Sequence, residues 1–302
     1  MKASQSIQQE GGPADGPRDS RPVGRERSRK RRPRLEDALI GVALLAGPAN
    51  TIMQLARPEV GYGVLESRVE SGRADLHPIK RARTTLTYLA VAVIGSDAQK
   101  AAFRRAVSSV HARVYSTPDS PVRYRASDPE LQMWVAACLY QGALVTQRTF
   151  IGEPDERDAE RHYREGMTLG STMQVPVQMW PENRAAFDRY WQESLDKVHI
   201  DDAIRDYLHP LALGRLRGLE LPRPLRRWAE SRALLITTGF LPQRFRDEMR
   251  FTWDAARQRR FDRLMALARA GNRLLPRFVR RFPFNLLLWD VRRRMKSGRP
   301  LV

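Results

Sequence analysis

The sequence predicts an all-α protein with a single multi-helix domain over residues 35–295. Three observations support this class. From Leu35 onward, apolar residues recur at spacings of three and four, which places them on one face of a helix. Helix-start signals, in which a proline follows Asp or precedes an acidic residue, recur along the chain. No convincing run alternates apolar and polar residues as a half-buried strand would.

The two ends of the chain have the composition of tails. Residues 1–34 consist largely of Gly, Pro, Ser, Gln and Arg, so we expect a disordered basic N-terminal tail. They contain no apolar stretch of the kind found in a secretory signal, which predicts no signal peptide and a cytoplasmic protein with peripheral membrane contact. Residues 296–302 are expected to form a short basic C-terminal tail.

The most apolar segment, residues 38–56, is nineteen residues long and is the best candidate for a transmembrane helix. It contains Gly41, Asn50 and Gln54 together with the pair Gly47-Pro48, and polar or helix-breaking residues are unfavourable where a helix faces lipid. We therefore predict a buried core helix that is broken near Gly47-Pro48.

The N-terminal half contains three well-signalled helices. His77-Pro78 opens a helix that Gly95 ends, and Ser96-Asp97 can cap the next one. Asp128-Pro129 places Asp at the cap and Pro at the first helical position. The helix that follows, Leu131 to about Thr149, is apolar on nearly all sides and is expected at the centre of the domain.

Further helices are predicted in the second half. Pro154-Asp155 and Pro181-Glu182 each open one. Two more are expected over 222–239 and 242–270, the second rich in arginine. The run Phe284–Trp289 should dock on the body, because it is too apolar to remain in water.

The formal net charge of +19 is concentrated in two segments. Residues 18–34 carry a net charge of +7 and residues 222–299 a net charge of +15, while the intervening chain is close to neutral. A basic surface suits anionic lipid or nucleic acid, through contacts with phosphate. Because no zinc finger, RNA-binding motif or recognition helix is visible, nucleic-acid binding is disfavoured as the main function.

Few residues have a spacing that indicates chemistry. The single cysteine, Cys138, excludes an internal disulfide, and its apolar surroundings predict an inert buried thiol. The sequence has no phosphate-binding loop, metalloprotease motif or nucleophile elbow. No two of the five histidines share a helical metal-ligand spacing.

His111 differs from the other histidines because it borders an apolar stripe formed by Phe103, Val107, Val110 and Val114. An unsatisfied buried polar group costs about 1–3 kcal/mol, so an imidazole here must form a hydrogen bond or bind a ligand. Two interpretations stay open. The residue is either a satisfied core histidine or the one protein ligand that haem iron requires, since the macrocycle supplies four donors.

The preceding helix places Arg81, Thr85 and Tyr88 on one side, with Thr84 beside them. One interpretation is a solvated face with an interhelical hydrogen bond. The other is functional: either a polar distal wall above iron, or an arginine that pairs with a haem propionate.

Several segments, in this order and spacing, resemble the latex-clearing protein and MpaB oxygenase family. They are QLARPEVGYGV (54–64), RARTT (81–85), VHARV (110–114), YRASDPELQMWV (124–135), EGMTLGSTMQVPVQMWP (165–181) and GFLPQRFR (239–246). The resemblance extends over roughly 35–294, nearly all of the predicted folded part.

The resemblance implies a helical fold with a globin-like core that holds haem b, and cleavage of isoprenoid carbon–carbon double bonds by dioxygen. It implies that His111 is the proximal iron ligand and that Arg81 and Thr85 line the distal side. Thr84 stands where rubber-cleaving relatives have lysine, and Ala136 stands where many relatives have histidine. Glu66 is a candidate base near the site.

These observations together predict a haem-dependent oxygenase in which His111 binds iron and Arg81, Thr84 and Thr85 polarise dioxygen. The substrate is expected to be a hydrophobic, isoprenoid or lipid molecule, and the basic surface would contact anionic membranes. The alternative is a non-catalytic haem- or lipid-binding helical protein associated with membrane surfaces. A third interpretation is a basic helical protein that acts only through its tails.

Overall fold

The computed structural model describes residues 34–69, 78–215 and 221–302. The chain divides into Met1–Arg32 and a compact unit Pro33–Val302, and the fold described is that of the second unit. Within the described ranges every regular element is a helix, and the only β-type pairing is an isolated bridge between Tyr115 and Arg125. The predicted all-α class is confirmed.

The longer helices are α1 (Gly47–Leu55), α2 (Pro58–Leu65), α3 (Pro78–Ile94), α4 (Asp97–His111), α5 (Pro129–Thr146), α6 (Glu156–Ser171), α7 (Arg184–Leu195), α8 (Asp202–Ala212), α9 (Arg223–Phe240), α10 (Gln243–Glu248), α11 (Ala255–Leu274) and α13 (Phe284–Lys296). The shorter turns are η1 (Leu35–Ala38), η2 (Gly41–Ala46), η4 (Gln147–Ile151), η5 (Val177–Met179) and α12 (Arg277–Arg280).

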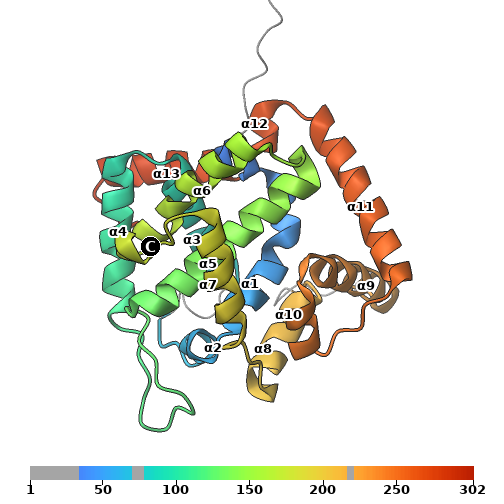
Figure 1. Ribbon diagram of the computed structural model, residues 1–302, viewed down its shortest axis with the longest axis horizontal. Coiled ribbons are helices and arrows are strands. Elements are labelled where there is room, and N and C mark those ends of the chain that lie inside the picture. The colour runs from blue at the N-terminus through green and yellow to red at the C-terminus, as the bar shows by residue number, and fades with distance from the viewer. Residues whose placement is uncertain (1–33, 70–77, 216–220) are drawn as a thin grey trace, which may run out of the picture. The chain divides into compact units, whose positions relative to one another are not determined.

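Helix α5 lies at the centre of the unit, as its apolar sequence predicts (Figure 1). Trp134 and Cys138 are fully buried on it, α1 and α6 pack against it, and η4 continues it. Trp134 stacks on Trp191 of α7 with ring centroids 5.3 Å apart, and its indole N–H donates to the Gln54 carbonyl. Burial of a large aromatic side chain is a main source of core stability, so α5 organises the surrounding helices.

The predicted cap residues begin three of these helices. The Ser96 hydroxyl accepts a hydrogen bond from the Gln99 amide at the start of α4. Asp128 caps α5 through the Glu130 amide, and Asp155 caps α6 through the Asp158 amide. Each side chain satisfies an amide that has no partner within its helix. His77 lies outside the described residues, but α3 begins at Pro78 as expected.

The helical run of α5 extends past the predicted end near Thr149, because α5 continues without a break as the π-helical turn η4 to Ile151. Two other predicted boundaries were wrong. Helix α7 begins at Arg184, because Asn183 rather than Pro181-Glu182 provides the cap. The single helix predicted over 242–270 is divided into α10 and α11, because Arg250 adopts a positive φ of 57° that an α-helix does not accommodate.

The segment 38–56 is broken at Gly47-Pro48, as predicted. Residues Gly41–Ala46 form a 3-10 helix and α1 begins at Gly47, with Pro48 in its first turn. Ile52 and Leu55 are buried in the core. Among the described residues, no helix combines the length and apolar character needed to cross a membrane.

The run Phe284–Trp289 docks on the body through one face only. Phe284, Leu288 and Val291 are buried, and α13 packs against α3. Leu286 and Trp289 remain 51% and 54% exposed. The expectation of docking therefore holds for one face of α13 and is wrong for the other.

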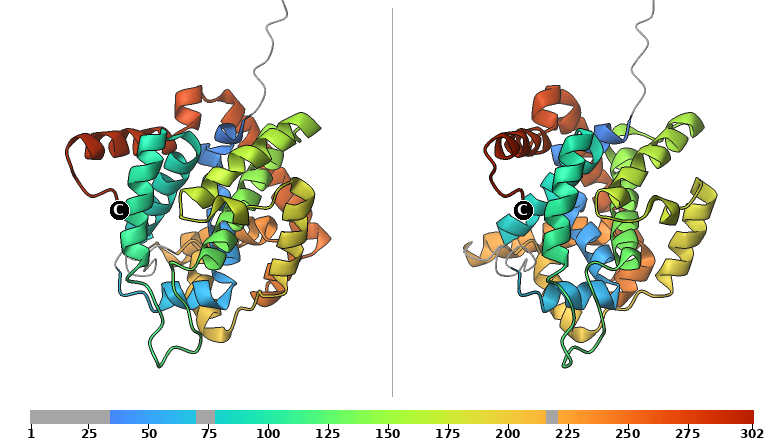
Figure 2. Two further views of the ribbon diagram at one scale, coloured as in Figure 1. Left: turned by 60° about the vertical axis from the view of Figure 1, so that its left-hand side comes forward. Right: turned by 90° about the vertical axis from the view of Figure 1, so that its left-hand side faces the viewer.

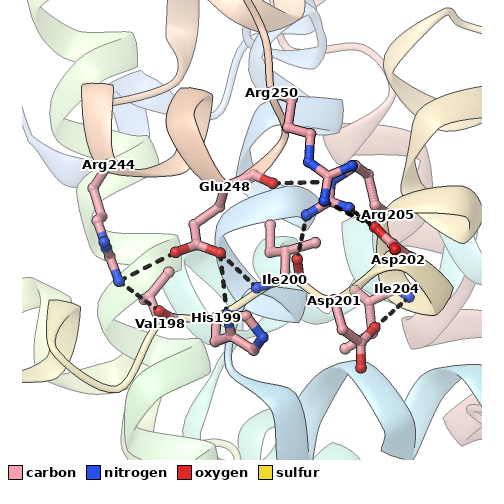
Figure 3. A network of polar contacts seen from close by, with 10 residues as sticks. All are labelled: Val198, His199, Ile200, Asp201, Asp202, Ile204, Arg205, Arg244, Glu248 and Arg250. Atoms are coloured by element: carbon pink, nitrogen blue, oxygen red, sulfur yellow. Dashed lines mark hydrogen bonds and ion pairs between the residues drawn. The ribbon is translucent and has the colours of Figure 1, made fainter.

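A polar network connects the segment that leads into α8 with α10 (Figure 3). The Glu248 carboxylate accepts from the Ile200 amide at 2.8 Å and pairs with Arg244 at 3.2 Å. Asp201 caps α8 through the Ile204 amide and also accepts from the Tyr62 hydroxyl at 2.6 Å. This second bond connects the start of α8 to α2, which forms one wall of the cavity described next.

Candidate functional site

A cavity of about 180 Å³ lies between α2, α3, α4 and α5. Its walls are mainly apolar, and this character favours a hydrophobic ligand with a few polar contacts. The apolar wall residues are Val60, Val64, Val69, Phe103, Val107, Val110, Val114, Leu131, Val135, Leu139, Met173 and Val302.

The four candidate residues lie around this cavity. Arg81, Thr84 and Thr85 reach it from α3, and His111 reaches it from the end of α4. Helical spacing explains the first group, because residues three and four apart share a face. Tyr88, one further turn along α3, also lines the cavity, but its hydroxyl donates to the Leu169 carbonyl.

Thr84 and Thr85 differ in what their hydroxyl groups bind. The Thr84 hydroxyl donates to the Lys80 carbonyl in the preceding turn of its own helix at 3.0 Å. No hydrogen bond of the Thr85 hydroxyl is formed with the described part of the chain. With respect to the described residues, Thr85 is therefore the threonine whose hydroxyl remains available to a molecule in the cavity, whereas the Thr84 hydroxyl donates within its own helix.

Arg81 is a partly buried cation without a counter-ion among residues 34–69, 78–215 and 221–302. Burial lowers the pKa of its guanidinium, because a charge is less stable away from water. Arginine remains protonated in proteins even so. An unneutralised guanidinium on an apolar cavity is a binding position for a carboxylate or another anionic group.

His111 is neutral at physiological pH. Burial first, and then the positive charge of Arg81, lower its pKa from 6.5 to about 4. Arg81 and His111 both line the cavity, which explains why the charge of Arg81 acts on the imidazole. A neutral imidazole is the protonation state that a metal ligand requires.

Gln132 is the polar neighbour of His111. Its Nε2 donates to the Ala126 carbonyl at 2.8 Å and lies 3.4 Å from His111 Nδ1. In this arrangement Nδ1 is the acceptor, so the neutral ring carries its proton on Nε2. The Gln132 Oε1 atom is buried and has no hydrogen-bond partner within the described residues. A rotation of this amide would present an acceptor to a proton on Nδ1, at the expense of the bond to Ala126.

Two carboxylates lie near the cavity in different positions. Glu66 does not line it; Glu66 lines an adjacent hollow and accepts from the Tyr124 hydroxyl at 2.8 Å. Glu59 does line the cavity and pairs with Arg57 at 3.4 Å. The candidate base suggested by the sequence thus lies outside the cavity, and its hydrogen-bond partner Tyr124 lines both spaces.

Sequence reasoning missed Gln132, Glu59 and Tyr124 as site residues. Each falls within a segment that carries the family resemblance, namely 54–64 or 124–135. Polar residues inside those segments were the available signal. Nothing local distinguishes them, because their place on the cavity depends on how α2 and α5 pack against α3 and α4.

The low pKa of His111 predicts a loss of stability at acidic pH. The unfolded chain takes up a proton near pH 6.5, whereas the folded protein does so near 4. Between these values the free energy of unfolding should fall by up to about 1.4 kcal/mol per pH unit from this group. Urea unfolding of the haem-free protein at about pH 7, 5.5 and 4.5 measures the effect. A His111→Gln variant should lose less stability over this range. If the free energy of unfolding falls equally with pH in the native chain and the variant, His111 is not the group responsible.

No group of three or more His, Cys, Asp or Glu side chains within the described ranges is placed to hold a metal ion. Cys138 is buried in α5, and burial raises its pKa well above the ordinary value. The thiol is thus protonated and unreactive, as the sequence predicts.

Comparison with known proteins identifies the family. The profile described as ER-bound oxygenase mpaB/B'/Rubber oxygenase, catalytic domain, matches residues 37–270. Uncharacterized proteins of Mycobacterium bovis and Mycobacterium tuberculosis are each 48% identical over 260 residues, which is 86% of this chain and 100% of theirs. No solved structure matches. Since the profile covers most of the folded unit, including the helices that carry Arg81 and His111, the chain belongs to the mpaB and rubber oxygenase catalytic-domain family.

Proposed function

We propose that the protein is a haem-dependent oxygenase that cleaves a carbon–carbon double bond of a hydrophobic, isoprenoid or lipid substrate. One observation carries the proposal: a neutral imidazole, His111, lines the same apolar cavity as Arg81, a guanidinium with no counter-ion among the described residues. A macrocycle with its own four donors needs one protein ligand and a cation for its propionates.

The residues fit this group in three respects. His111 is uncharged and offers a ring nitrogen, while Arg81 offers an ion-pair partner to a carboxylate. The buried Gln132 Oε1 has no partner among the described residues, and after rotation of the amide it would accept from a protonated Nδ1 of His111 while the other ring nitrogen held the metal. Metal-binding histidines commonly donate their second ring N–H in this way. When bound, haem b would supply the iron that activates dioxygen.

The other residues have distinct roles in the proposed reaction. The Thr85 hydroxyl and the Arg81 guanidinium would stabilise negative charge that develops on oxygen. Apolar side chains from α4 and α5 would hold the alkene and exclude water. Cleavage of a carbon–carbon double bond by dioxygen places one oxygen atom on each of the two carbonyl products, so the atoms of the reaction balance.

The absorption spectrum of the full-length chain reconstituted with haem b tests this proposal. The native chain should show a Soret band that is absent from a His111→Ala variant of unchanged helical content. His209→Ala is the matched control, because His209 is exposed on α8 and away from the cavity. A native chain without the band, or an unaffected variant, would reject the haem site.

Dioxygen uptake separates an oxygenase from a haem or lipid carrier on the same scaffold. An oxygenase should consume one dioxygen for each double bond cleaved when an isoprenoid alkene is added. A carrier would keep the spectrum and show no uptake. Such a result would leave the binding site in place and reject the catalytic proposal.

A further inference from the structure

Helices α12 and α13 present large apolar side chains to solvent. Phe278 is 70% exposed, Phe282 57% and Trp289 54%. Leu274, at the end of α11, is 86% exposed. Single exposed apolar residues are common, but a series of large ones on adjacent elements marks an interaction surface. We call Leu274, Phe278, Phe282, Leu286 and Trp289 the apolar patch.

The packing of α12 and α13 leaves the side chains of the apolar patch exposed to solvent. On α13 the buried residues Phe284, Leu288 and Val291 recur at helical spacing and face α3. Leu286 and Trp289 are three residues apart, and the helical period places them on the opposite side. The Asn285 side chain donates to the Phe278 carbonyl at 3.0 Å, which holds α12 beside the start of α13. Figure 2 shows the two helices next to each other at one edge of the unit.

Basic side chains surround the apolar patch. Residues 273–296 contain seven arginines, one lysine and a single acid, Asp290. Asp290 is already engaged by Arg83, Arg293 and Arg294. Arg273, Arg277 and Arg292 are exposed, and no acidic side chain of the described chain pairs with them. The surface therefore carries uncompensated positive charge next to aromatic and aliphatic groups.

We infer that the apolar patch and its arginines form a docking surface for an anionic lipid bilayer. Large apolar side chains enter the boundary between headgroups and acyl chains, and arginines contact the phosphates. Tryptophan and arginine both favour this interface. Phosphate contacts alone would suit nucleic acid, but such a surface would not need exposed leucine and phenylalanine.

The position of the surface suits a hydrophobic substrate. Helix α13 packs directly on α3, whose opposite face carries Arg81 and Thr85 to the cavity. The chain beyond α13 then reaches the cavity, where Val302 forms part of the wall. A bilayer at α12 and α13 would thus lie one helix away from the cavity. This inference does not depend on haem binding.

Co-sedimentation of the full-length chain with vesicles tests the inference. Vesicles of phosphatidylcholine with about one-third phosphatidylglycerol should bind the chain, and phosphatidylcholine alone should bind it weakly. A Phe278→Ser, Trp289→Ser double variant retains every charge, and its partition coefficient should fall about tenfold or more. Tyr115→Ser is the matched control, since Tyr115 is 57% exposed in a distant loop.

Three results would overturn the inference. Equal binding of native chain and double variant would show that electrostatic contacts elsewhere account for the interaction. A concentration-dependent dimer in sedimentation velocity, lost in the double variant, would identify the patch as an interface between copies. Binding to duplex DNA that the double variant loses, without any vesicle binding, would identify nucleic acid as the partner.

Discussion

Replacement of Arg81 by methionine is expected to weaken haem binding about 10- to 150-fold. A hydrogen bond to a charged group contributes about 1.5–3 kcal/mol. Arg81 has no counter-ion among the described residues, so a bound haem propionate would supply one. Methionine preserves much of the side-chain volume and removes the charge. Titration of haem b into the full-length chain, followed by the Soret absorption, measures the dissociation constant.

The same variant has a second readout that needs no haem. Arg81 lowers the pKa of His111, although burial is the larger cause. In Arg81→Met this pKa should therefore rise from about 4 but remain below 6.5, which NMR titration of the imidazole detects. Arg83→Met is the matched control, because Arg83 lies on the same helix, pairs with Asp290 and does not line the cavity. Equal haem affinities in the two variants would show that Arg81 does not contact the group.

Replacement of Gly239 by alanine is expected to destabilise the fold by about 3 kcal/mol. A Cβ atom at this position would lie 2.2 Å from Cδ2 of Phe261 and within 2.6 Å of two more atoms of that ring. The ring cannot easily move, because it packs edge-on against Phe240 at 5.0 Å and against Trp253 at 6.1 Å. For a chain of this size the expected decrease in Tm is about 6–12 °C.

Replacement of Gly271 by alanine, also in a helix, is expected to stabilise the fold rather than destabilise it. Gly271 lies inside α11, and nothing lies within 4 Å of the Cβ that alanine would add. Alanine in a helix interior is favoured over glycine by about 1 kcal/mol, so the Tm should rise slightly. Thermal unfolding followed by circular dichroism compares both variants. A small effect of Gly239→Ala would mean that α9 and α11 separate without loss of stability.

Local signals in the sequence determined most of the secondary structure. The caps Ser96, Asp128 and Asp155 depend on hydrogen bonds to amides two or three residues away, so they can be read without knowledge of the fold. The central place of α5 follows from apolar residues on all its sides. The same reasoning failed over 242–270, where helical periodicity continues but the positive φ of Arg250 divides the helix.

The candidate residues Arg81, Thr84, Thr85 and His111 were also named from sequence, by helical position and by family resemblance. The structure adds what each side chain contacts. Thr84 bonds within its own helix, whereas Thr85 remains available to the cavity. The approach of Gln132 to His111 joins α5 to the end of α4 across twenty-one positions.

The sequence by itself thus determined the all-α class, the caps of its helices and the residue types at the site. The tertiary structure alone decided that Glu59, and not Glu66, reaches the cavity, and that Trp289 faces solvent while Leu288 is buried. The physical reason is the separation along the sequence of the residues that determine each feature. A cap or a helical stripe depends on residues a few positions apart, whereas the neighbour of a side chain across a cavity depends on how whole helices pack.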